Sequence, residues 1–213
     1  MADGRVVAID GPAGSGKSTV AKALAARLGV PYLDTGAMYR AVAFAALRRG
    51  VDPDDAETVA RIAEHLDLEV GDGGVTVDGV DASIEIRGAE VTRAVSAVAA
   101  NPDVRKELVR RQREWVADRG RSAVVEGRDI GTVVFPDAAL KAYLTARLEV
   151  RAGRRHKEVA DLDYEAVVAD MARRDTLDEG READPLACAA DALRIDTTDR
   201  SIEEIVEDLG SRL

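Results

Sequence analysis

The stretch Gly11-Pro12-Ala13-Gly14-Ser15-Gly16-Lys17-Ser18 decides how this chain folds, because its spacing, G-x-x-x-x-G-K-S, is that of a phosphate-binding loop. The residues before it, 5–10, are mostly apolar and β-branched, as in a buried strand. The residues after it, 19–28, favour a helix that ends at Gly29. A strand, a glycine-rich loop and a helix in this order are the setting that the motif requires, which disfavours an accidental glycine-rich turn.

The residue types explain how such a loop binds an anion. Its glycines allow the backbone to turn N–H groups toward one point, and the following helix directs its positive end to the same point. Lys17 is expected to reach the β- and γ-phosphates of a nucleotide. Ser18 is expected to offer its hydroxyl to Mg²⁺.

Composition limits the class of protein. The 213 residues suffice for one domain, or for one core with insertions. The net charge of −10 opposes binding to nucleic acid or an anionic membrane, and an aromatic share of 3% leaves few rings for base stacking. No apolar run is long enough to span a membrane, and the first strand follows Met1 closely, so a cytoplasmic protein is expected. Cys188 is the single cysteine and is expected to be buried. His65 and His156 are isolated, which disfavours metal binding by His or Cys.

Short apolar strands alternate with helices, which predicts the α/β fold of a P-loop NTPase with a doubly wound, five-stranded parallel sheet. The strands are expected at residues 5–10, 30–34, 122–126, 140–145 and 193–196. Ligands of such sheets bind at the carboxyl ends of the strands. We therefore expect one shared site from the segments that follow strands: the phosphate-binding loop, Asp34, Gly127-Arg128-Asp129 and Asp196-Thr197-Thr198.

The pattern changes between residues 66 and 86, where apolar and charged residues alternate and Asp78-Gly79 is typical of a hairpin turn. We expect a small antiparallel sheet there, inserted between helices as a separate lobe. A helix before it is expected to have Asp52 as its N-cap, with Pro53 at its first position. The sequence leaves open whether Trp115 and this lobe touch a substrate or only support the fold.

Several arginines lie where an anion could be bound. Arg128 follows a strand, and for this residue a functional role is favoured over a solvated one. Arginines at 147, 151 and 154–155 share one face of a predicted helix, where a phosphate would relieve the repulsion between like charges. Phosphoryl transfer depends on such positive charge, and an arginine-bearing flap would also exclude water. The arginines expected to be solvated or paired with acids are Arg27, Arg48, Arg49, Arg61, Arg110 and Arg111.

Taken together, these motifs resemble those of the bacterial cytidylate kinases, a family of nucleoside monophosphate kinases. The resemblance extends from Val7 to the last helix. Its most specific parts are Ile9-Asp10 with the phosphate-binding loop, Leu33-Asp34-Thr35-Gly36-Ala37-Met38-Tyr39-Arg40, the run from Glu126-Gly127-Arg128-Asp129 to Phe135-Pro136, and Arg173-Arg174-Asp175 with Asp178 and Arg181. The chain departs from the family at Thr176 and Leu177, where members often carry arginine.

The resemblance implies transfer of the γ-phosphoryl group of ATP to CMP or dCMP, giving ADP and CDP or dCDP, in pyrimidine nucleotide metabolism. The transfer would be direct and in line, with Mg²⁺ as cofactor. The implied parts are a core of residues 1–34, 106–147 and 176–213, a monophosphate-binding lobe of residues 35–105, and a helical lid of residues 148–175. A monomer is expected, with no nucleic-acid or membrane partner.

The resemblance also implies roles for individual residues. The catalytic residues would be Lys17, Arg128, Arg154 and Arg155. The ATP phosphates would be bound by Gly11, Pro12, Ala13, Gly14, Ser15, Gly16, Lys17, Ser18 and Thr19. The acceptor would be bound by Arg40, Arg128 and Arg181 at its phosphate, by Arg174 and Asp178 at its sugar, and by Ser96, Arg105 and Asp129 at cytosine, with Thr35 also on the substrate. Mg²⁺ would be held by Ser18 and, through water, by Asp34.

Hydrogen-bonding chemistry agrees with a cytosine reader. The N4 amino group of cytosine would donate to Asp129, and its acceptors would suit Arg105 and Ser96. Uracil would present an acceptor to Asp129, so CMP should be preferred over UMP. The alternatives are a kinase for another small acceptor such as UMP or shikimate, a GTPase switch, and a regulatory nucleotide-binding module. The chain lacks the Asn-Lys-x-Asp stretch with which a GTPase would read guanine.

Overall fold

The computed structural model describes residues 5–71, 73–158 and 163–213. Contacts between residues divide the chain into two compact units. The first unit comprises Met1–Pro31 and Arg121–Leu213, and the second comprises Tyr32–Gly120. The functional division into core, lobe and lid stays a prediction, and residues 159–162 of the expected lid lie outside the described residues.

The main sheet has five strands in the order β2-β6-β1-β7-β8, which confirms the predicted fold class. Its strands are β1 (Val6–Asp10), β2 (Tyr32–Asp34), β6 (Ala123–Gly127), β7 (Leu140–Thr145) and β8 (Leu193–Asp196). Strand β1 pairs in parallel with β6 and with β7, and β7 pairs in parallel with β8. Every residue of β6 is buried, including Glu126, as expected for a strand in a sheet covered on both faces.

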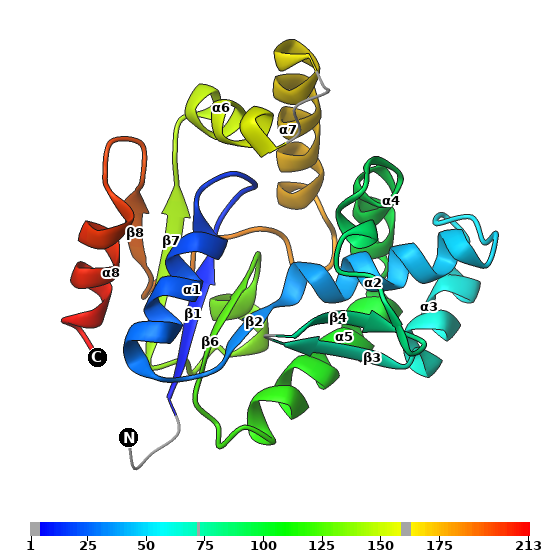
Figure 1. Ribbon diagram of the computed structural model, residues 1–213, viewed down its shortest axis with the longest axis horizontal. Helices are drawn as coiled ribbons and strands as arrows, with labels where there is room; N and C mark the ends of the chain where they lie inside the picture. The colour runs from blue at the N-terminus through cyan, green and yellow to red at the C-terminus, as the bar shows by residue number, and fades with distance from the viewer. Residues whose placement is uncertain (1–4, 72, 159–162) are drawn as a thin grey trace. The chain divides into compact units, whose positions relative to one another are not determined.

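The helices of the first unit are α1 (Lys17–Leu28), α6 (Leu148–Glu158), α7 (Tyr164–Glu179) and α8 (Ile202–Gly210). Helix α1 packs on β6 and against α8, while α6 packs against α7 (Figure 1). Gly29 ends α1 in a left-handed conformation, as predicted, and Ser201 begins α8 with a capping box. A short π-helix, η2 (Ile130–Val134), follows β6 and was not foreseen.

Helix α2 (Thr35–Arg48) is the central element of the second unit. It contacts α3 (Ala56–His65), α4 (Ala89–Ala100), α5 (Pro102–Ala117) and the short 3-10 helix η1 (Glu85–Arg87). Its alanines at 37, 41, 43, 45 and 46 are buried, so neighbouring helices can approach its backbone closely. The break between α4 and α5 lies at Asn101, whose side chain caps α5, and Pro102 occupies the first turn.

The small antiparallel sheet was also predicted correctly. It consists of β3 (Leu68–Gly71), β4 (Gly74–Val77) and β5 (Val80–Asp81), and β3 and β4 are visible as neighbouring strands in Figure 1. Asp78 and Gly79, which join β4 to β5, have φ angles of 52° and 74°. Positive φ at both positions is the signature of a type I′ turn, the turn whose twist matches that of paired strands.

Two expectations from the sequence were wrong. Helix α3 begins after Asp55 rather than Asp52. The Asp52 carboxylate accepts a hydrogen bond from the Asp54 N–H, which makes a turn, while Asp55 accepts one from the Thr58 N–H and caps the helix. Cys188 is exposed rather than buried. Within the described ranges, none of the helices is both long and apolar enough to cross a membrane.

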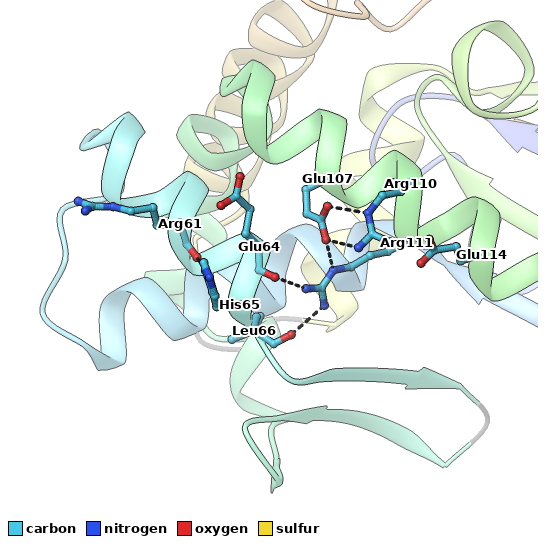
Figure 2. A network of polar contacts seen from close by, with 8 residues as sticks. All are labelled: Arg61, Glu64, His65, Leu66, Glu107, Arg110, Arg111 and Glu114. Carbon is cyan, nitrogen blue, oxygen red and sulfur yellow. Dashed lines mark hydrogen bonds and ion pairs between the residues drawn. The ribbon is translucent and has the colours of Figure 1, made fainter.

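Arg111 joins α5 to the end of α3 (Figure 2). Its guanidinium donates to the carbonyl oxygens of Glu64 and Leu66 at 2.9 and 2.8 Å, and it pairs with Glu107 at 2.6 Å. The last carbonyls of a helix lack hydrogen-bond donors within the helix, so the Arg111 guanidinium provides donors from a neighbouring helix. Trp115, one turn further along α5, donates to the carbonyl of Val70 at 2.8 Å and therefore supports the fold of this unit.

We predict that Arg111→Met lowers the free energy of unfolding by about 1–3 kcal/mol, because two carbonyls and one carboxylate lose a charged donor. Arg110→Met is the matched control. Arg110 pairs with Glu107 and Glu114 of its own helix, and because the Arg110 side chain is 53% exposed these pairs contribute about 0–1 kcal/mol. Urea unfolding followed by circular dichroism measures both variants. Equal losses for the two variants would contradict the capping role of Arg111.

Candidate active site

The phosphate-binding loop has the strained backbone that its glycines allow. Gly11, Gly14 and Gly16 have φ angles of 145°, 71° and 87°. A Cβ atom at Gly11 would lie 2.0 Å from the carbonyl oxygen of Leu144, so no other residue fits at this position. The loop therefore reaches its shape through glycine and close packing against the end of β7.

Lys17 is buried at the first position of α1, and its ammonium group donates to the carbonyl of Pro12 at 2.7 Å. Burial lowers the pKa of Lys17 to about 7, and the positive charge of Arg128 adds to this effect. The carboxylates of Glu126 and Asp10 act in the opposite direction. A nucleotide phosphate would be a further anion beside this lysine and would favour its charged form.

Ser18 is hydrogen-bonded to Glu126, an acid for which the sequence predicted no role. The hydroxyl of Ser18 donates to Oε2 of Glu126 at 3.0 Å, and Glu126 is buried at the end of β6. A hydroxyl and a carboxylate are the oxygen ligands that suit Mg²⁺, so this pair fits the ion that the family implies. An acid at the end of a predicted strand could have indicated a role for Glu126. The sequence does not show, however, that this strand, β6, lies beside β1.

Asp34, the expected water-mediated Mg²⁺ ligand, has other contacts in the second unit. Its Oδ1 accepts from the N–H of Ala37 at 3.0 Å and caps α2, while its Oδ2 pairs with Arg87 at 3.0 Å. Within residues 5–71, 73–158 and 163–213, no three His, Cys, Asp or Glu side chains form a cluster that could hold a metal by themselves. The binding of Mg²⁺ by Asp34 through water stays a prediction.

Arg128 and Asp178 form the central ion pair of an arginine cluster in the first unit. Nε of Arg128 donates to Oδ2 of Asp178 at 2.8 Å. Burial opposes the charge of Arg128, but the carboxylates of Asp178, Asp175 and Glu126 together outweigh it and raise the pKa of the guanidinium. Burial alone would raise the pKa of Asp178, whereas Arg128, Arg181 and Arg174 together lower it. Burial and the charge of Arg128 lower the pKa of Arg174. The structure thus gathers four residues predicted for acceptor binding.

Asp10 fixes the segment that carries Asp129. Its buried carboxylate accepts hydrogen bonds from the backbone N–H groups of Ile130 and Gly131, both at 2.8 Å. These donors begin the π-helix η2 directly after Asp129, which is itself buried. Burial raises the pKa of Asp10 to about 6, although the two hydrogen bonds act in the opposite direction.

The expected lid arginines occupy helix α6. Arg154 donates to the carbonyl of Gly14 at 3.4 Å, and it also binds the side chain and the carbonyl of Thr197. Arg155 is half-buried, and its charge contributes to the lowered pKa of Arg174. Arg154 therefore contacts the backbone of the phosphate-binding loop, through the carbonyl of Gly14.

The remaining predicted residues lie in the second unit. Arg40 donates to the carbonyl of Ile86 at 3.1 Å and to the hydroxyl of Thr92 at 2.9 Å. Arg105 is buried, donates to the carbonyl of Ala99 at 3.3 Å, and lies over the ring of Tyr39 with 5.6 Å to the centroid. The other members of the set are Thr35, buried at the start of α2, and Ser96, half-buried on α4.

The family model described as cytidylate kinase matches residues 7–212. The chain belongs to the cytidylate kinase family. The cytidylate kinase of Mycolicibacterium paratuberculosis is 52% identical over 218 residues, covering 98% of this chain and 95% of that protein. The cytidylate kinase of Corynebacterium glutamicum is 48% identical over 216 residues, covering 98% and 94%.

Solved structures of other proteins share the fold of this cytidylate kinase family member. A gluconokinase from Sinorhizobium meliloti has a TM-score of 0.52 at 16% identity and covers 98% of this chain and 91% of its own. TT1252 from Thermus thermophilus has a TM-score of 0.52 at 22% identity, with coverage of 99% and 98%. At such identities the likeness concerns the fold alone.

We predict that Asp10→Asn changes how stability depends on pH. The folded protein holds a proton on Asp10 up to about pH 6, whereas the unfolded chain loses it near pH 3.8. The wild type therefore loses stability as pH rises between these values, by about 3 kcal/mol relative to Asp10→Asn. Urea unfolding at pH 4.5, 5.5 and 7 measures the difference.

The loss of one acceptor lowers the stability of Asp10→Asn at every pH, so the slope is the informative quantity. A constant difference between the variant and the wild type from pH 4.5 to 7 would show that Asp10 does not titrate in this range.

Proposed function

We propose that this chain transfers the γ-phosphoryl group of ATP to CMP or dCMP, giving ADP and CDP or dCDP. The observation that carries the proposal is the membership of nearly the whole chain in the cytidylate kinase family. The phosphate-binding loop, with Lys17 buried behind it, supplies the donor half of the chemistry. We also place the protein in the cytoplasm, as a monomer, in pyrimidine nucleotide metabolism.

The mechanism requires little covalent chemistry from the protein. The acceptor phosphate is already an anion, so no protein nucleophile or dedicated general base is needed. Lys17 and the loop N–H groups would bind the ATP phosphates and orient the γ-phosphoryl group. Mg²⁺, when bound with ATP, would supply positive charge that offsets the negative charge of the phosphates. Ser18 would hold the ion directly, and Glu126 would orient its water ligands more readily than Asp34, whose oxygens cap and pair within the second unit.

The arginine cluster suits an anionic acceptor. Arg128 and Arg181 would bind the CMP phosphate, and Asp178 with Arg174 would bind the sugar. A phosphate would favour the charged form of Arg174, whose pKa is lowered by burial and by Arg128. In the second unit, the family resemblance gives the phosphate to Arg40 and cytosine to Ser96 and Arg105, while Thr35 would also contact the substrate. Arg154 and Arg155 would stabilise the charge on the transferring group.

An assay that couples ADP release to NADH oxidation tests the proposal. The reaction contains MgATP and one acceptor at a time: CMP, dCMP, UMP, AMP, GMP or shikimate. We expect fast turnover with CMP and dCMP alone. Equal turnover with UMP would retain a kinase but refute the cytosine reading. ATP binding without turnover on any acceptor would favour a regulatory nucleotide-binding module.

We predict that Asp129→Ala lowers kcat/KM for CMP by about 10- to 100-fold, because the cytosine amino group loses its acceptor. The preference for CMP over UMP should shrink, since uracil has no amino group to lose. Asp137→Ala, which removes an exposed carboxylate further along the same segment, is the control and should leave both acceptors unaffected. Equal decreases of kcat/KM for CMP and UMP would show that Asp129 does not discriminate between the two bases.

We predict that Glu126→Gln raises the Mg²⁺ concentration for half-maximal rate by about 10-fold or more, as when a residue that orients metal ligands is lost. ATP affinity in the presence of EDTA should change little, because the amide still accepts from Ser18. Calorimetric titration with ATP in EDTA provides this second readout. A Mg²⁺ requirement equal to that of the wild type would return the role to Asp34.

A further inference from the structure

The backbone carbonyls of four successive loop residues each accept a hydrogen bond from a side chain. Lys17 donates to Pro12 at 2.7 Å, and Arg151 donates to Ala13 at 3.1 Å. Arg154 donates to Gly14 at 3.4 Å, and the hydroxyl of Thr197 donates to Ser15 at 2.9 Å. Three of these donors come from segments far along the chain, so the loop is braced by other elements of its unit.

The carbonyl contacts determine which way the N–H groups point. In a trans peptide unit, the carbonyl of one residue and the N–H of the next point in opposite directions. The donors that hold the carbonyls of Pro12 to Ser15 therefore also set the directions of the N–H groups of residues 13–16, and the bond from Thr197 turns the N–H of Gly16 away from Thr197. Convergent N–H groups are what an anion-binding loop requires.

The four donors differ in whether they can stay when nucleotide binds. Lys17 and Arg154 are the residues proposed to reach the phosphates, so bound phosphates would compete with the carbonyls of Pro12 and Gly14 for these donors. Arg151 is held by the carbonyl of Ala146 at 3.0 Å and by Asp175 at 2.6 Å, so its position also depends on α7.

Thr197 is anchored to the sheet itself. It follows β8, it is 2% exposed, and its N–H donates to the carbonyl of Thr145 at the end of β7 at 2.8 Å. Its hydroxyl donates to Ser15 and accepts from Arg154 at 3.0 Å. Because it carries no charge and is tied to the strands, it can hold the loop before and after nucleotide binding.

We propose that Thr197 is a positioning residue of the phosphate-binding loop, which fixes the Ser15 carbonyl so that the loop N–H groups face the phosphates. The proposal rests on the proposed function in one respect, that the loop binds ATP. Thr197 acts through the backbone of the loop and touches no reacting atom. Its hydroxyl also accepts a hydrogen bond from Arg154, so Thr197 links the segment after β8 to helix α6.

The test compares Thr197→Val, which keeps the shape and removes the hydroxyl, with Thr197→Ser, which keeps the hydroxyl. Thr76→Val is the matched control, because Thr76 lies in β4 of the second unit and its hydroxyl bonds only weakly to Glu69, at 3.5 Å. For Thr197→Val we expect KM for ATP to rise about three- to tenfold, the effect of one lost hydrogen bond. KM for CMP should stay within about twofold, and Thr197→Ser should restore the wild-type value.

Tripolyphosphate separates a loop effect from a contact with the nucleoside. Its inhibition constant against ATP should rise in Thr197→Val by the same factor as KM for ATP, because it offers only phosphates to the loop. An unchanged inhibition constant would overturn the proposal and give Thr197 a contact with the nucleoside. Equal rises of KM for ATP and for CMP, with a lowered unfolding midpoint, would reduce Thr197 to a purely structural residue.

The same measurements separate this proposal from the proposed function. If the wild type phosphorylates none of the acceptors, affinities of ATP and tripolyphosphate can still be measured by calorimetry. Parallel weakening of both ligands by Thr197→Val would then support the positioning role while the acceptor assignment fails. Unchanged affinities with normal CMP turnover would refute the positioning role alone.

Discussion

Charge buried at the carboxyl ends of β1 and β6 is the constraint on which the rest of the first unit depends. Asp10, Lys17, Glu126 and Asp178 are all buried, and Arg128 lies among them. An ion removed from water without a partner is costly, so each charge must be placed beside an opposite one or a backbone dipole. Strands β1 and β6 contribute the acids Asp10 and Glu126, and the bases Lys17 and Arg128 come from α1 and from the segment after β6. The hydrogen bonds of Asp10 and Ser18 complete the arrangement.

This constraint explains why the loop, the π-helix and the arginine cluster form one site within the unit. Moving any one charge leaves its neighbours unpaired, so the geometry is held more firmly than isolated contacts would allow. The second unit uses a different principle. Small buried residues along α2 let three helices pack closely around it, and polar side chains such as Arg111 and Trp115 attach the ends of α3 and β3 to α5.

Local patterns predicted much of this structure. The loop, the helix stop at Gly29 and the Asp78-Gly79 turn depend on neighbouring residues, which the sequence displays directly. The predicted start of α3 was wrong because Asp52 and Asp55 are residues of the same type, equally suited to cap a helix. Only the hydrogen bonds in the structure show that Asp55 is the cap. The predicted burial of Cys188 was wrong because a residue with apolar neighbours in the sequence need not be buried in the fold.

The contacts that were missed depend on the order of strands in space. Glu126 meets Ser18 because β6 lies beside β1, and Thr197 meets Ser15 because β8 ends near the loop. Neither pairing leaves a signal at fixed spacing along the chain. The predicted site residues of the first unit converge for the same reason, since Arg128 directly follows β6 and Asp178 lies in α7.

The two sheets also differ in how their chain segments must meet during folding. Gly71 pairs with Gly74 across the β3–β4 turn, whereas Val6 pairs with Ala123, more than one hundred positions away. Closing the longer loop costs more conformational entropy, and topologies rich in such distant pairs fold slowly. A hairpin forms within about 1–10 μs, so β3 and β4 can pair long before β6 reaches β1. We therefore expect the central strand pair, which places Glu126 beside Ser18, to form late and to slow the folding of the chain.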